Sequence, residues 1–201
     1  GGLGGVRVEV LAHDEFGYTE TRKDGRFNLV VNGGGALTLR FTRAGYLEAQ
    51  RTVRPQWNQY ALLDSVAMIG RTQRSELVNL ASSGGARSRF QSDANGDREL
   101  GMFFRSGTVA RVVKQAGDTV NFSSWVRVRA SEYTVGSQGI NAMPATLPPS
   151  SAYTFCADLT LDQADSLQLS GHPAPEVLFT KPVSCYVRNF LSLPVGAGVP
   201  Q

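Results

Sequence analysis

The chain has 201 residues, of which 41% are hydrophobic and 18% are charged. That length suits one large or two ordinary globular domains, and the small net charge of +3 with no lysine- or arginine-rich block argues against a nucleic-acid partner. No apolar run reaches the ~18 residues of a membrane helix, so we expect no membrane span.

Alternating apolar and polar residues predict a series of short strands between residues 6 and 69. Turn residues separate these strands, and the Asp24-Gly25 pair is a strong hairpin signal. The apolar run at residues 60–69 fits either a helix or a strand, and we interpret it as a strand. The predicted strands are residues 6–11, 19–22, 26–31, 36–41, 47–53 and 60–69.

The first 50 residues contain two short motifs: a Thr-x-x-Asp-Gly-x-Phe-x-Leu run (Thr21, Asp24, Gly25, Phe27, Leu29) and a Gly-Tyr pair (Gly45, Tyr46). Together with the strand at residues 6–11, they resemble the small transthyretin-like sandwich called the carboxypeptidase regulatory-like domain. The resemblance implies a first domain at residues 1–70. Such modules usually serve as non-catalytic spacers and as adhesion or assembly units.

The transthyretin-like pattern implies one more strand ahead of Gly1. Without it, Val6, Val8 and Val10 are expected to lie beside an open sheet edge that accepts a strand from another chain. The alternative is that this strand belongs to a longer form of the protein.

Residues 89–104 predict a hairpin with Asn95-Gly96 at its tip. Oxygen-bearing side chains recur at alternate positions of this loop, as a calcium site requires. The match to an EF-hand loop is incomplete, so we interpret the loop as an exposed tip without a metal and keep calcium as the weaker alternative. The candidate ligands are Asp93, Asn95, Asp97 and Glu99.

Three stretches in the second half, residues 128–136, 142–154 and 182–191, carry a second resemblance, and Pro194-Val195-Gly196 closes it. They are similar to the region that precedes the tyrosine-aspartate repeats in large bacterial RHS-repeat proteins, which are relatives of insecticidal toxin-complex shells and of animal teneurins. The resemblance implies a second domain at residues 71–201, also a β-sandwich, in a secreted or cell-surface protein. Trp125, Arg127 and Arg129 alternate with apolar residues, as expected of a strand with one wet face.

The only plausible helix is a short one at residues 161–169. Cys156 and Cys185 lie in two separate strand-like runs, without the spacing of a metal site. They are either two small buried hydrophobic residues or one disulfide between neighbouring strands of the second domain. Because the chain resembles exported proteins, we predict the disulfide.

The predicted fold is therefore all-β: two antiparallel β-sandwich domains, the first transthyretin-like, with at most one short helix. No hydrolase elbow, zinc-protease motif, phosphate loop or supported Cys/His pair is present, so we expect neither an enzyme nor a cofactor. The predicted function is a structural or interaction module of an exported bacterial RHS-like protein, acting in assembly or as a plug or spacer. Its expected partner is protein, either a second copy or the rest of a larger chain. Alternatives are a calcium- or carbohydrate-dependent adhesion module, using the 93–99 loop or Trp57, and a small hydrolase.

Overall fold

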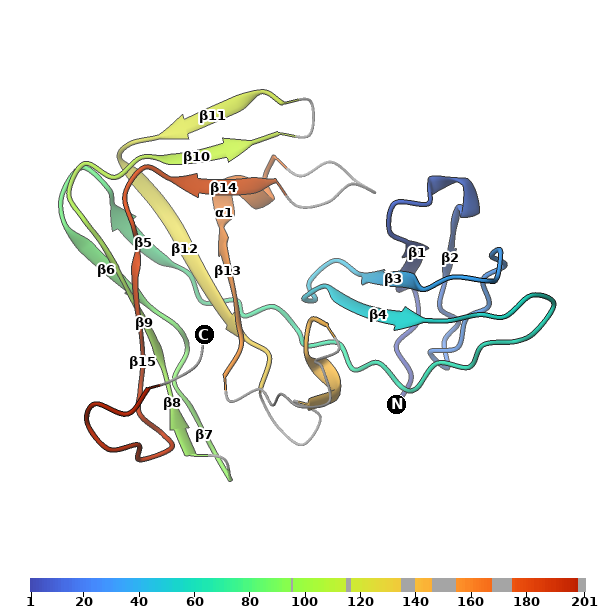
Figure 1. The fold of residues 1–201 in the computed structure, drawn as a ribbon. Helices are drawn as coiled ribbons and strands as arrows, with labels where there is room; N and C mark the ends of the chain where they lie inside the picture. The colour runs from blue at the N-terminus through green and yellow to red at the C-terminus, as the bar shows by residue number, and fades with distance from the viewer. Residues whose placement is uncertain (95, 115–116, 135–139, 146–154, 168–174, 199–201) are drawn as a thin grey trace. The chain divides into compact units, whose positions relative to one another are not determined.

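The computed structural model describes residues 1–94, 96–114, 117–134, 140–145, 155–167 and 175–198. Among them, every paired strand runs antiparallel to its neighbour, and the one α-helix spans four residues (Figure 1). The predicted all-β fold class is thus confirmed. The chain forms two compact units: Gly1–Arg71 with Tyr133–Cys156, and Thr72–Glu132 with Ala157–Gln201.

The first unit is built on a four-stranded sheet of order β2-β1-β3-β4. Because side chains alternate along a strand, one face of β1 and β3 is apolar, and Val8, paired with Phe41, is completely buried there. Its strands and 3-10 turns are β1 (Arg7–Val10), η1 (Asp14–Phe16), β2 (Tyr18–Glu20), β3 (Leu37–Thr42), β4 (Ala49–Val53) and η2 (Ile140–Ala142).

The strands expected at residues 26–31 and 60–69 are absent, so these two predictions were wrong. The apolar side chains of both segments still pack against the core of the sheet: Phe27, Leu29, Val31, Leu63, Val66 and Met68. The Phe27 ring, for example, meets the Phe41 ring edge to face at 5.7 Å between centroids. The alternation at residues 26–31 therefore marked the inward-facing, partly buried positions, although no backbone ladder forms there.

The Thr-x-x-Asp-Gly motif holds the start of the chain. The buried Thr21 hydroxyl donates to the Leu3 carbonyl at 2.6 Å and accepts from the Val6 amide at 2.9 Å. Asp24 accepts from the Arg26 amide, and Gly25 takes a φ of +83°, which glycine tolerates best. These motif residues therefore stabilise the fold of the first unit.

β1 lies inside the sheet, paired with β2 on one side and β3 on the other. The expectation of an open acceptor edge beside Val6, Val8 and Val10 was therefore wrong. All three valine side chains are buried in the core, and the outer strands of this sheet are β2 and β4. Strand order within a sheet does not follow chain order, which is why the sequence pattern misplaced the edge.

A segment distant in sequence covers the outer side of β4. The Gln50 amide donates to the Pro144 carbonyl at 2.7 Å, and the Arg51 guanidinium donates to the Met143 and Asn141 carbonyls at 2.8 and 2.6 Å. We call residues 140–145 the returning strap. The strap packs with the first unit, whereas the sequence placed it in a domain spanning residues 71–201.

A small second cluster joins this part of the chain to the first unit. Leu47, Tyr133 and Met143 are buried together, with Ile69 packed against them. The Tyr133 hydroxyl donates to the Glu48 carbonyl at 3.1 Å, so its polar end is also satisfied.

The described residues of the second unit form three three-stranded sheets and one hairpin, with orders β13-β12-β5, β15-β9-β6, β11-β10-β14 and β7-β8. β12 has the predicted two faces, because Val126, Val128 and Ala130 are buried and Trp125 and Arg127 are exposed. Its elements are β5 (Glu76–Asn79), β6 (Gly84–Arg87), β7 (Gln91–Asp93), β8 (Gly96–Arg98), β9 (Leu100–Phe104), β10 (Ala110–Val113), β11 (Thr119–Phe122), β12 (Trp125–Glu132), β13 (Ala157–Leu161), α1 (Asp162–Asp165), β14 (Glu176–Phe179) and β15 (Ser184–Val187).

Candidate interaction surfaces

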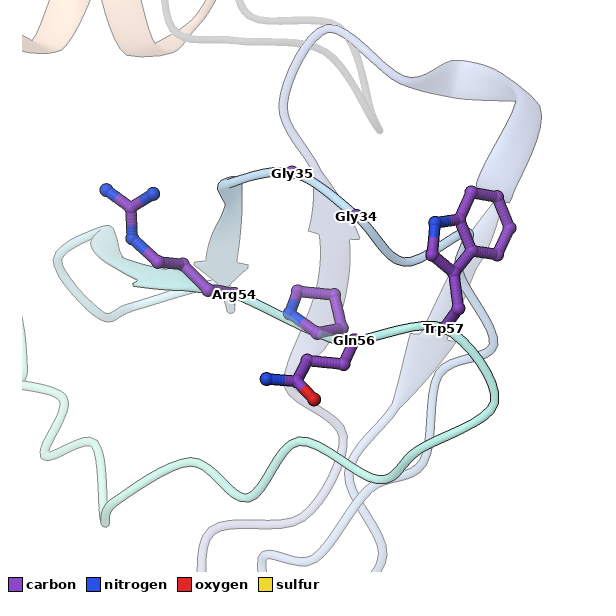
Figure 2. Close-up of a pocket in the computed structure, with 6 residues that line it drawn as sticks. Gly34, Gly35, Arg54, Gln56 and Trp57 are labelled. Atoms are coloured by element: carbon purple, nitrogen blue, oxygen red, sulfur yellow. The ribbon is translucent and has the colours of Figure 1, made fainter.

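A shallow hollow of about 520 Å³ lies on the first unit between the glycine turn after residue 32 and the segment that follows β4. Figure 2 shows the Arg54 and Trp57 side chains at opposite ends of this segment, with Gln56 between them and Gly34 and Gly35 alongside. The lining offers a guanidinium, an amide and an indole ring, and it contains no nucleophile or general base. Such a surface can bind a ligand or a protein, but it has no catalytic group.

The glycines let the turn approach the segment closely. A Cβ on Gly33 would lie 2.6 Å from the Gln56 carbonyl carbon, and one on Gly34 would lie 2.7 Å from Trp57 Nε1. Gly34 also has a φ of +101° and donates its amide to the Pro55 carbonyl at 2.9 Å. The close approach of the turn to Trp57 therefore requires glycine at positions 33 and 34.

The chain after this hollow is unusually apolar for a surface. Trp57 is 66% exposed, and the Tyr60 and Leu62 side chains are almost completely exposed. Val30 is also among the exposed large apolar residues of this unit. We call residues 57–62 the apolar segment, because three large apolar side chains within six residues are exposed, and exposed apolar surface is typical of interaction sites.

Only the tip of the hairpin predicted at residues 89–104 is present, as β7 and β8, and Asn95 lies outside the described residues. The expected second arm was wrong in part, because residues 100–104 form β9, which pairs with β6 and β15. Both carboxylate oxygens of Asp93 accept from Arg98, each at 2.8 Å, and Arg98 Nε donates to Glu132 at 2.6 Å. A cation bound by Asp93 would have to displace this arginine. Asp97 accepts from Ser92.

Glu99, the last calcium candidate, forms an ion pair with Arg87, with 3.7 Å between Oε2 and Nη1. Across the described residues, no group of three or more His, Cys, Asp or Glu side chains is arranged to hold a metal ion.

Arg98 is the residue of this site that sequence reasoning missed. Its side chain is 1% exposed, and its hydrogen bonds to Asp93 and then Glu132 raise the pKa of the guanidinium above its usual value despite burial. A signal was available: Arg98 shares the two-residue period of Leu100, Met102 and Phe104, which are all buried.

The two cysteines do not lie on neighbouring strands, so that expectation was wrong. Cys156 precedes β13, which pairs with β12, whereas Cys185 lies on β15, which pairs with β9. Cys156 belongs to the first unit, where its carbonyl accepts from the Tyr133 amide at 2.9 Å. Neither cysteine forms a disulfide in the structure, and partial desolvation raises the pKa of the Cys185 thiol although most of its side chain is exposed.

A second hollow, of about 880 Å³, lies over the outer face of the β15-β9-β6 sheet. Gly85 and Gly101 form its floor, with Phe103 and Tyr186 beside them. Only the Tyr186 carbonyl, at 3.8 Å, would meet a Cβ added to Gly101, so the missing side chain leaves open space above the sheet. Tyr186 itself is 67% exposed.

Comparison with known proteins identifies relatives of the first unit. A family model described as the teneurin TTR-like domain matches residues 1–68. Teneurin-1 of Gallus gallus is 45% identical over 74 residues, 37% of this chain and 3% of the relative. Teneurin-m of Drosophila melanogaster is 49% identical over 67 residues, 33% of this chain and 2% of the relative.

The chain thus spans only 2% to 3% of the length of these curated relatives. Residues 1–68 form a transthyretin-like domain similar to that of teneurins. No helix among the described residues is long and apolar enough to cross a membrane.

Proposed function

We propose that this chain is a non-catalytic interaction module of a much longer surface or secreted protein of the teneurin and RHS type. The observation that carries the proposal is the apolar segment, in which Trp57, Tyr60 and Leu62 project into solvent from a transthyretin-like unit. Leaving such side chains in water is costly, so they are expected to pack against another part of the longer protein.

The residues of the transthyretin-like motif support a structural role. Thr21, Asp24 and Gly25 are used in hydrogen bonds and a turn that hold the unit together. The finer assignment, to the region preceding the tyrosine-aspartate repeats of a bacterial RHS-like protein, rests on residues 128–136, 142–154 and 182–191. The intact mass of the native protein, compared with that of this chain, tests whether such a longer chain exists.

Tryptophan fluorescence tests the docking of the apolar segment. The difference in emission between the unmodified protein and its Trp57→Phe variant isolates Trp57, both in this chain with its two tryptophans and in the longer protein. We expect the Trp57 emission to move to shorter wavelength in the longer protein than in the 201-residue chain. An equally solvent-exposed Trp57 in both proteins contradicts the proposal.

Carbohydrate recognition at the same hollow is a second candidate. An exposed indole face beside the Gln56 amide and the Arg54 guanidinium offers the mixture of flat apolar surface and hydrogen-bond donors that sugars require. Binding on a glycan array that Trp57→Ala abolishes, with an unchanged melting temperature, supports this candidate. Binding that persists in Trp57→Ala excludes this site.

A further inference from the structure

One strand edge of the second unit, at β15, is exposed and carries apolar side chains. Among the described residues, β15 pairs only with β9, and in that ladder Arg188 N–H donates to the Glu99 carbonyl at 3.0 Å. Because hydrogen-bonded pairs alternate along an antiparallel ladder, the backbone N–H and C=O groups of Tyr186 and Ser184 also point toward β9. The backbone groups of Cys185 and Val187 therefore point away from it.

The other side of β9 agrees with this alternation. Ser88 N–H donates to the Leu100 carbonyl at 2.8 Å. The backbone groups of the even-numbered residues of β9 therefore point toward β6, and those of the odd-numbered residues point toward β15. No described residue donates to or accepts from the outward backbone groups of Cys185 and Val187.

Nothing in β15 protects this edge. The strand reads Ser-Cys-Tyr-Val, without the proline, lysine or bulge that commonly blocks edge pairing. The Cys185, Tyr186 and Val187 side chains are all exposed, although cysteine, tyrosine and valine favour buried strands. A partner strand would bury these side chains and satisfy the outward backbone groups together.

The edge is complementary to itself. In a two-fold pairing centred on Tyr186, Cys185 of one copy lies opposite Val187 of the other, and both carry outward hydrogen-bonding groups. In the same register Arg188 lies opposite Ser184, so no like charges face each other across the pair. The two Tyr186 rings meet on the outer face, beside the hollow over Gly101.

We infer that a second copy of this chain adds to β15 and joins two β15-β9-β6 sheets into one. The contact is isologous, with main-chain hydrogen bonds linking the two copies and the apolar side chains of β15 filling the seam. This interface is separate from the apolar segment, so its failure leaves the proposed docking of Trp57 unaffected.

A disulfide trap tests both the dimer and its register. Facing residues of a non-hydrogen-bonded pair have Cα atoms about 4.5 Å apart, within the range of a disulfide. In a chain with Cys156→Ser and Cys185→Ser, Tyr186→Cys is expected to form a cross-linked dimer under mild oxidation. Phe103→Cys is the matched control, since it is exposed on the same sheet but on the central strand β9. Equal cross-linking of the two variants, or none, overturns the inference.

A proline variant tests the edge without cross-linking. Val187→Pro removes an N–H that points away from β9, so the fold is expected to tolerate it, whereas Val187→Ile keeps the donor. Sedimentation of the unmodified chain is expected to show a mass that rises with concentration from 21.7 kDa toward twice that value. Val187→Ile is expected to behave in the same way and Val187→Pro to remain a monomer. A monomeric unmodified chain at all concentrations, or a Val187→Pro dimer, overturns the inference.

Discussion

Arg98 and Glu132 form an ion pair in the interior of the second unit, with 2.6 Å between Nε and Oε1 and with side chains 1% and 4% exposed. This pair joins β8 to the end of β12, and Asp93 completes it from β7. The geometry satisfies two charges that would otherwise be costly to bury.

Removing one member of this pair is expected to be strongly destabilising. Arg98→Met removes the guanidinium that pairs with the buried Glu132 carboxylate, which we expect to lower the free energy of unfolding by about 3–5 kcal/mol. The double variant Arg98→Met/Glu132→Leu is expected to lose less than the sum of the two single variants, because the buried carboxylate is removed as well. Urea denaturation of all three variants measures this coupling, and additive losses would show that the two side chains act independently.

The returning strap depends on Arg51. Arg51→Met removes the donors to the Met143 and Asn141 carbonyls. We therefore expect the free energy of unfolding to fall by about 1–3 kcal/mol and the strap to open before the rest of the unit. Hydrogen exchange at the Gln50 and Ala67 amides, which donate to strap carbonyls, is expected to accelerate. Arg54→Met, in the exposed lining of the hollow, is the control. Unchanged protection of both amides in Arg51→Met would mean that the strap is held without the arginine.

The glycine turn beside Trp57 gives a graded prediction. Gly33→Ala places a Cβ 2.6 Å from backbone, whereas Gly35→Ala meets nothing within 4 Å and has no positive φ. We expect Gly33→Ala to destabilise the first unit by more than about 1 kcal/mol and Gly35→Ala to stay within about 0.5 kcal/mol of the unmodified protein. Thermal melts followed by tryptophan emission compare the two, and equal melting temperatures would rule out the close approach.

Cys185 gives a pH prediction. Partial desolvation raises the pKa of its thiol although most of the side chain is exposed, so the folded state favours the neutral form. The resulting stabilisation is present below the unfolded pKa and is lost as the pH rises through the folded value. Because the thiolate is the nucleophile, a Cys156→Ser variant is expected to react with iodoacetamide more slowly when folded than in guanidinium at about pH 8. The gap should close at higher pH, and identical rates at every pH would contradict the shift.

The sequence predicted features that are local along the chain. Alternation identified β1, β3 and the two faces of β12, and the Asn-Gly pair identified the β7-β8 hairpin. Alternation at residues 26–31 reflects burial of Phe27 and Leu29, which needs no ladder partner, so the prediction of a strand went too far. Periodicity therefore reports which side of a segment is buried and leaves open whether its backbone pairs.

Features that join distant parts of the chain could not be predicted. The strap is held by the Arg51 side chain, which donates to the Met143 and Asn141 carbonyls, and such contacts leave no spacing in the sequence. The position of β1 between β2 and β3 likewise depends on strand order, which turn residues alone do not reveal. The hollow beside Trp57 depends on a glycine turn meeting a segment beyond two strands.

The returning strap also determines what a protease can separate. The chain passes between the two units at residues 71–72, 132–133 and 156–157. A single cut in an exposed turn between residues 72 and 132 leaves two fragments, and each fragment contributes to both units. The nicked protein is therefore expected to elute as one species under native conditions and to fall into two pieces only in denaturant. A domain boundary drawn from the cut site would then end the first unit between residues 72 and 132 and overlook the strap that completes it.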